Sequence, residues 1–171
     1  MPDDAPRMGK ADLICNPQSV KIRFGKKGIV QIESLSKCIL LTDLRLQENS
    51  VRRIGGLDAC SKLVTLDLSD NRIEHIEGLS MLTALRTLSL GQNLIETIAP
   101  GCLDHLVSLT DLDLANNRLL KLENLGKLVA LTHLRVEGNR IIAIEGLARL
   151  TKLKFLNITR NNVKKIARLQ S

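Results

Sequence analysis

The sequence predicts an α/β solenoid, a curved right-handed coil with short parallel strands on its concave face. Three observations predict it. A pattern of leucines, one asparagine and isoleucines recurs every 22 residues along most of the chain of 171 residues. Within each copy two leucines alternate with polar residues, as in a half-buried strand. One copy cannot bury its own apolar side chains, so its neighbours in the stack must cover them.

Residues 63–84, LVTLDLSDNRIEHIEGLSMLTA, illustrate the unit. Leu66 and Leu68 are expected to point inward, and their neighbours in the strand toward solvent. Asn71 ends the strand and can give its side-chain amide to backbone groups of the adjacent coils. Apolar residues three apart follow, at Ile73, Ile76, Leu79 and Leu82. This spacing favours 3₁₀ or short helical turns on the convex side.

The repeat frame divides the chain. The first segment is polar and contains proline, so we expect it to be disordered or loosely packed. Residues 19–171 form the repeat domain, in which two extra residues at Pro100-Gly101 lengthen one coil. The boundaries are 1–18 for the N-terminal segment, 19–40 for a degenerate first repeat, 41–152 for five full repeats and 153–171 for a partial repeat.

The repeats resemble those of leucine-rich repeat proteins. The N-x-I-x-x-I-E-G-L character, seen in Ile76-Glu77-Gly78-Leu79 and again in Ile144-Glu145-Gly146-Leu147, is similar to the SDS22-like subclass with repeats of 22 residues. The resemblance implies a scaffold or regulatory module that is not an enzyme and binds a protein on its concave face. Known members imply a phosphatase subunit or a cytoskeletal, axonemal or centrosomal component as that partner.

One departure from the subclass concerns the end of the chain. Many members close the last coil with a segment that carries Asn-Pro and a later Tyr-Arg, and neither follows Asn161. An open end would leave apolar side chains and a strand edge uncovered. We therefore expect either that the chain is a piece of a longer protein, or that another segment or subunit, including a second copy, covers this end.

The cysteines and the N-terminus bear on the compartment. Cys38 and Cys60 lie 22 residues apart, hence in adjacent coils, so a bridge between them is conceivable, but their column otherwise holds buried leucines. We expect reduced thiols. The chain has no run of 18 apolar residues and does not begin like a signal peptide. A cytoplasmic location follows as a prediction, with the cytoskeleton, the cilium or flagellum and the nucleus as variants.

Candidate binding residues are those that face solvent on the predicted strands or directly after them. Residues 63–130 hold 9 acids and 5 bases, whereas residues 131–171 hold 2 acids and 9 bases, so an acidic centre meets a basic end. Such a field orients a partner. Phe155 is the expected anchor, although it could instead cover the end of the stack. The concave-face candidates are Asp67, Asp70, Asp111, Asp113, His133, Arg135, Phe155, Asn157 and Arg160.

A polyanion, either RNA or the acidic surface of tubulin, is the alternative partner. It would bind a basic patch in the C-terminal third, made of Lys152, Lys154, Lys164, Lys165 and Arg168. Such binding would weaken steeply with salt. The acidic centre would repel nucleic acid from most of the concave face, and we therefore prefer a protein partner.

Catalytic and metal chemistry are not predicted. The three histidines fall in different coils, without cysteine or carboxylate at metal-ligand spacing. A rod without a deep pocket gives no place to assemble a nucleophile and its base. A phosphate-binding glycine loop is missing too. We predict no enzyme activity, no metal, no cofactor and no membrane association.

Overall fold

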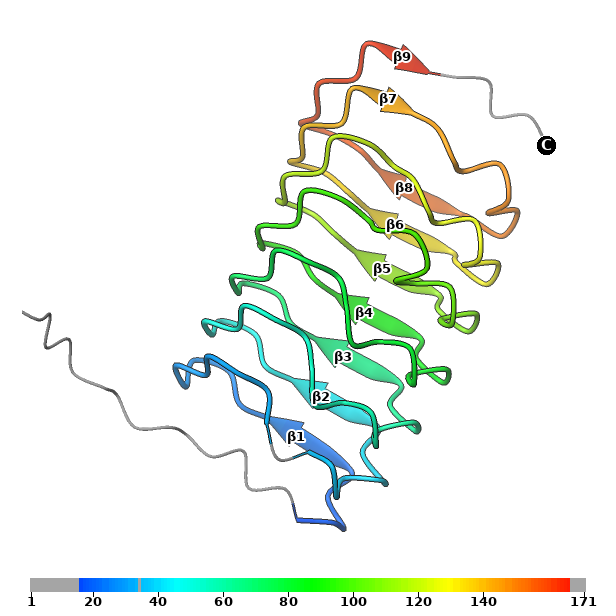
Figure 1. The fold of residues 1–171 in the computed structure, drawn as a ribbon. Helices are drawn as coiled ribbons and strands as arrows, with labels where there is room; N and C mark the ends of the chain where they lie inside the picture. Colours follow the sequence, from blue (N-terminus) through cyan, green and yellow to red (C-terminus); the bar gives the residue numbers. More distant parts are fainter. Residues whose placement is uncertain (1–15, 34, 167–171) are drawn as a thin grey trace, which may run out of the picture.

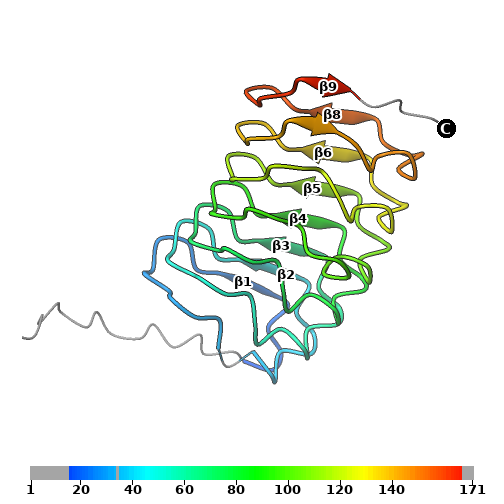
Figure 2. The ribbon, with the colours of Figure 1, turned by 45° about the horizontal axis from the view of Figure 1, so that its top comes forward.

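The computed structural model describes residues 16–33 and 35–166. Its coils stack in one direction, with the main strands on one wall and the returning segments on the other (Figures 1 and 2). The predicted solenoid is confirmed. The strands are β1 (Lys21–Arg23), β2 (Asp43–Arg45), β3 (Thr65–Asp67), β4 (Thr87–Ser89), β5 (Asp111–Asp113), β6 (His133–Arg135), β7 (Ala143–Ile144), β8 (Phe155–Asn157) and β9 (Lys165–Ile166).

Seven of these strands form one parallel sheet in the order β1-β2-β3-β4-β5-β6-β8. Residues one repeat apart are paired, as in Leu44 with Leu66 and Leu66 with Leu88. From β4 to β5 the paired residues are Leu88 and Leu112, so the two extra residues of that coil are absorbed outside the sheet. β7 and β9 pair separately on the returning wall.

The core is a column of aliphatic side chains between the two walls. The central residue of each strand from β2 to β6 is buried, and Leu66 and Leu88 have no exposed surface. Their strand neighbours Thr65 and Thr87 are partly exposed. In the last coil Leu153 and Leu156 are only partly buried against the core. The predicted alternation of inward and outward residues is therefore confirmed.

Asparagines join successive coils as predicted. Asn93 is buried, accepts the backbone N–H of Ile73 at Oδ1 (2.9 Å), and donates from its amide to the carbonyl oxygens of Leu68 and Leu90 (both 3.0 Å). The bonds satisfy backbone groups that the bend removes from the sheet ladder. The same arrangement recurs at Asn49, Asn71, Asn117, Asn139 and Asn161.

The convex side differs from the prediction in one detail. Hydrogen bonds of the 3₁₀ type link Leu82 to Leu79 and Leu85 to Leu82, but they are three residues apart. A 3₁₀-helix needs such bonds at consecutive residues. The described residues therefore contain single turns and no helix.

A glycine column lets these turns stack closely. Gly78 has φ +67°, and a Cβ atom there would lie 2.5 Å from the carbonyl oxygen of Ile54 in the preceding coil. An L-residue is disfavoured both by this φ and by the missing space. In a later coil Asn124 takes the equivalent position with φ 59° and donates its amide to the carbonyl oxygen of Ile98 at 2.7 Å.

The cysteines require a correction. Cys60 and Cys102 are free thiols, so the conceivable bridge between Cys38 and Cys60 does not form. Cys38, however, is disulfide-bonded, and the expectation that all thiols are reduced is wrong at this residue. Cys15 lies outside the described residues. Since disulfides persist in oxidising compartments, cytoplasmic location loses one of its supports and stays a prediction.

Candidate functional site

The strand registers bring the predicted concave-face residues into two columns. Asp111 pairs with His133, and His133 with Phe155, at the first position of β5, β6 and β8. At the third position Asp113 pairs with Arg135 and Arg135 with Asn157. Their side chains face away from the core because the intervening leucines point into it. These six residues form a contiguous surface, which we call the C-terminal concave cluster.

An aromatic group lies at one end of this cluster. Phe155 is 43% exposed on the face of the sheet. The guanidinium carbon of Arg135 lies 5.7 Å from the centroid of its ring, within the range of a cation–π contact. The ring of His133 lies 5.9 Å away at an interplanar angle of 32°. Phe155 is thus held by two neighbours and still offers apolar surface to solvent.

His133 is in turn positioned by the coil before it. Its Nδ1 lies 2.9 Å from the hydroxyl of Thr132 and 3.4 Å from a carboxylate oxygen of Asp111. The Thr132 hydroxyl donates to the carbonyl oxygen of Thr110 at 3.0 Å, so it accepts from an Nδ1–H of His133. The cluster therefore continues from Asp111 through His133 to Phe155 across three strands.

Some of the candidate residues also stabilise the turn after their strand, which the sequence analysis missed. Asp67 accepts the backbone N–H and the hydroxyl of Ser69, at 3.0 and 2.7 Å. Asp113 accepts the backbone N–H of Ala115 at 2.9 Å, and Asn157 that of Thr159 at 3.2 Å. An aspartate or asparagine two residues before these N–H groups is the sequence signal of such a turn. One oxygen of each carboxylate holds the strand end, and the other can face a partner.

Two of the predicted site residues occupy a strained position in the turn that follows the strand. Asp70 and Arg160 have φ 53° and 54°, in the left-handed region. Both are exposed, so their side chains extend from the edge of the concave face. Their column also contains Lys26, Glu48, Gln92, Asn116 and Gly138.

A charged group on β1 and β2 was also missed. Asp43 is only 9% exposed and lies between Arg23 and Arg45, whose guanidinium groups are 3.2 and 3.0 Å from its carboxylate. Burial opposes ionisation, but hydrogen bonds from Arg45 and Arg23 outweigh it, so the pKa of Asp43 lies below its usual value. The sequence signal was an aspartate in the first-position column next to two successive arginines in the third-position column. Basic groups therefore flank the acidic centre at both ends.

The alternative basic patch is divided. Lys154 directly precedes β8 of the seven-stranded sheet, whereas Lys164 directly precedes β9 of the two-stranded sheet. Lys152 is exposed in a turn before Lys154. The structure does not bring these residues together on one sheet. Side-chain placement of Lys165 and the position of Arg168 lie outside the described residues.

Family models identify the repeats. The leucine rich repeat model matches residues 61–119, and a second leucine rich repeat model of two copies matches residues 107–149. The chain is a leucine-rich repeat protein. Its SDS22-like character stays a prediction. Comparison with curated proteins gave no match.

Solved structures share this leucine-rich repeat fold. Internalin C2 of Listeria monocytogenes is 28% identical, with a TM-score of 0.78 over 87% of this chain and 64% of that protein. Internalin InlF of the same organism is 22% identical, with a TM-score of 0.75, covering 88% and 43%. A leucine-rich repeat protein of Leptospira interrogans is 25% identical, with a TM-score of 0.72, covering 79% and 35%. The chain thus spans less than two thirds of the length of each.

The fold is of the kind that serves as a protein-interaction module. Stacked coils present long columns of side chains on one face, which suits recognition of a macromolecule rather than enclosure of a small molecule. Within residues 16–33 and 35–166 no helix has the length and apolar character needed to cross a membrane.

Proposed function

We propose that this leucine-rich repeat protein is a non-catalytic docking module that binds a protein partner across its concave face, with Phe155 as the anchor. The observation that carries the proposal is the exposed ring of Phe155, held between Arg135 and His133. Binding energy in protein interfaces concentrates on a few such residues, and aromatics and arginines are enriched among them.

The position of Phe155 in its column supports this role. The same position in the preceding coils carries polar or charged residues, and none of them is aromatic except the imidazole of His133. Phe155 is absent from the apolar core of the stack. An exposed phenylalanine with little structural duty and little freedom to move loses less entropy when a partner covers it.

Charge supports an oriented complex. The acidic residues of β3 and β5 lie between arginines of β1 and β2 on one side and Arg135 and Arg160 on the other. Alternating sign along one face favours a partner with the complementary order of charges and fixes its register along the sheet. We propose the partner classes implied by the SDS22-like resemblance, a phosphatase subunit or a cytoskeletal or ciliary protein, as those to test first.

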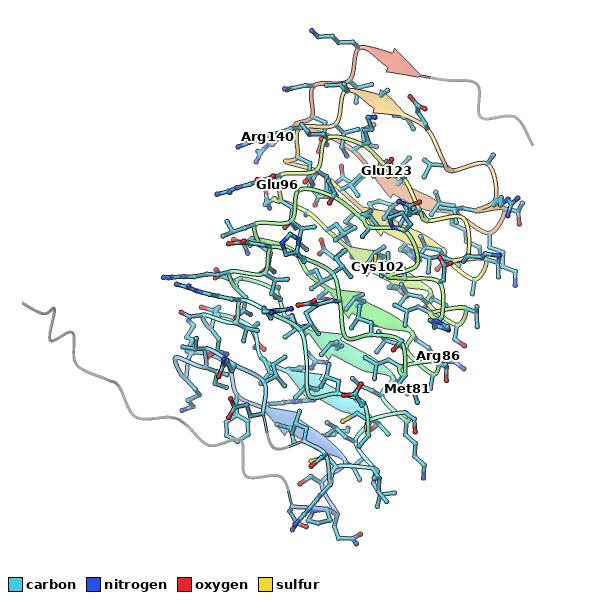
Figure 3. All side chains as sticks on the ribbon, viewed as in Figure 1. Met81, Arg86, Glu96, Cys102, Glu123 and Arg140 are labelled. Atoms are coloured by element: carbon cyan, nitrogen blue, oxygen red, sulfur yellow. The ribbon has the colours of Figure 1, made fainter. Side chains whose placement is uncertain are left out.

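The experiment is affinity capture from a native extract with three versions of the full chain. Wild type is compared with Phe155→Ala and with Met81→Ala, because Met81 is 50% exposed and lies at the edge of the stack (Figure 3). A partner on the concave face should be lost with the first variant, at a cost of about 2 kcal/mol or more, and kept with the second. Retention by both variants would overturn the proposal.

The salt dependence of binding distinguishes protein docking from the polyanion alternative. That alternative rests on the net charge of +7 carried by residues 131–171. Docking around Phe155 should persist at elevated ionic strength, whereas polyanion binding should fall steeply. Charge reversal of Lys164 and Lys165 should abolish only the second kind of binding. The polyanion alternative would be favoured if the captured species still bound Phe155→Ala but was lost at high salt and with the charge reversal of Lys164 and Lys165.

A further inference from the structure

The most informative group in the C-terminal concave cluster is Arg135, because its charge is unpaired. Some arginines of the described chain pair with a carboxylate, as Arg45 does with Asp43 at 3.0 Å and Arg53 with Glu77 at 2.7 Å. Among the described residues no carboxylate oxygen lies within 4.0 Å of the Arg135 guanidinium. Its guanidinium makes a cation–π contact with the ring of Phe155.

This lack of pairing is notable because acids are close by in the sheet. Asp113 is in register with Arg135, yet one of its oxygens accepts the N–H of Ala115 instead. Asp111 stands at the first position of β5. One of its oxygens accepts the hydroxyl of Thr110, and the other lies 3.4 Å from Nδ1 of His133. One oxygen of Asp113 and both oxygens of Asp111 thus have other partners, and the Arg135 guanidinium lies over the ring of Phe155.

The guanidinium over the ring keeps its N–H donors available. None of them has a hydrogen-bond or ion-pair partner among the described residues, and guanidinium N–H groups match the two oxygens of a carboxylate. The side chain is exposed, so this edge is accessible. Arg160 and Lys154, both exposed and without an ion pair in the described chain, add positive charge at the same end.

We propose, building on the docking function above, that the partner segment bound here carries a carboxylate next to an apolar side chain. The carboxylate pairs with Arg135, and the apolar side chain covers the free surface of the Phe155 ring. A protein segment supplies both groups from adjacent residues. A nucleic acid would supply the anion but would bring further phosphates toward Asp111 and Asp113, where they are repelled.

Blocked synthetic peptides of one length test this chemistry with the full chain, by amide NMR titration. They contain Glu-Phe-Glu, Glu-Ala-Glu or Lys-Phe-Lys between Gly-Ser flanks. The first should shift the resonances of β6 and β8 and bind at least about tenfold more tightly than either of the others at that position. A uridine oligonucleotide forms the fourth arm, and stronger binding of it at β6 and β8 would overturn the assignment.

Charge reversal gives the decisive comparison. Arg135→Glu should weaken Glu-Phe-Glu at least about tenfold and strengthen Lys-Phe-Lys at β6 and β8. Arg140→Glu is the matched control, because Arg140 is an exposed arginine of the same coil at its turn edge (Figure 3). The dispersion of the amide spectrum reports whether each variant is folded, and Arg135→Gln replaces Arg135→Glu if the latter is not.

The two proposals fail differently. Equal loss with Arg135→Glu and Arg140→Glu, or no preference for the acidic aromatic peptide, would overturn the carboxylate assignment. Loss of a captured partner with Phe155→Ala would still uphold the docking function in that case. Retention of the partner by Phe155→Ala would overturn the docking function itself.

Discussion

Replacing Asn93 by alanine tests the hydrogen bonds that join the coils. Asn93 is 5% exposed, and its Oδ1 accepts the backbone N–H of Ile73 at 2.9 Å. Its amide donates to the carbonyl oxygens of Leu68, Leu90 and Gly91 at 3.0, 3.0 and 3.2 Å. One substitution removes all of these bonds.

The stability loss in Asn93→Ala depends on which of the backbone groups bonded to Asn93 keep another hydrogen-bond partner. The three carbonyl oxygens keep other donors, from the amides of Asn71 and Asn117 and from the backbone N–H of Asp70. Only the N–H of Ile73 is left buried without an acceptor, which costs about 1–3 kcal/mol. The lost side-chain packing adds to this, so we expect Asn93→Ala to lower the free energy of unfolding by about 2–4 kcal/mol.

Urea unfolding followed by circular dichroism measures this loss. The control is Asn162→Ala, at an exposed asparagine that directly follows the ladder residue Asn161, and it should cost less than about 0.5 kcal/mol. Asn93→Asp should be worse than Asn93→Ala at neutral pH, because a carboxylate would face three carbonyl oxygens, and should recover on acidification as it is protonated. A cost at Asn93 no larger than the cost at Asn162 would refute the reasoning.

Three further predictions test other parts of the structure. Gly78→Ala should cost more than about 2 kcal/mol by urea unfolding, and Gly28→Ala clearly less, because both have φ near +68° but only Gly78 meets a backbone oxygen. Leu88→Ala should cost about 2–5 kcal/mol and Thr87→Ala far less, whereas equal losses would mean a wrong register. Burial raises the pKa of the Cys102 thiol to about 11, so its alkylation in the native protein should be slow at pH 8 and accelerate with rising pH toward that value; a rate independent of pH would contradict this.

The repeat frame could be predicted because many residues specify it together. Each coil repeats the same inward leucines and the same asparagine, so an error at one position would conflict with every other copy. The pairing of Asp111 with His133 and Phe155 followed directly from this frame, including the longer coil between Leu88 and Leu112. Sequence periodicity thus placed the candidate residues on one face and in the correct order.

Contacts between neighbouring surface side chains could not be predicted in the same way. The register places Arg135 beside Asp113, and a salt bridge would be the simple expectation from charge, yet the guanidinium lies over Phe155. Rotamer choices on an exposed face differ by small free energies and leave no periodic trace. The disulfide of Cys38 was missed for a related reason, since a cysteine in a column that otherwise holds buried leucines is equally suited to packing.

Stability and recognition are assigned to different residues of the same strand. In β6, Leu134 is fully buried and contributes to the core, whereas His133 and Arg135 beside it face solvent. The asparagine ladder satisfies the backbone whichever side chains the concave face carries, because it bonds only to main-chain groups. The surface columns can therefore differ from coil to coil without loss of the fold. A phenylalanine and an unpaired arginine can therefore be exposed at one end of the sheet without destabilising the fold. Both side chains are then free to contact a partner.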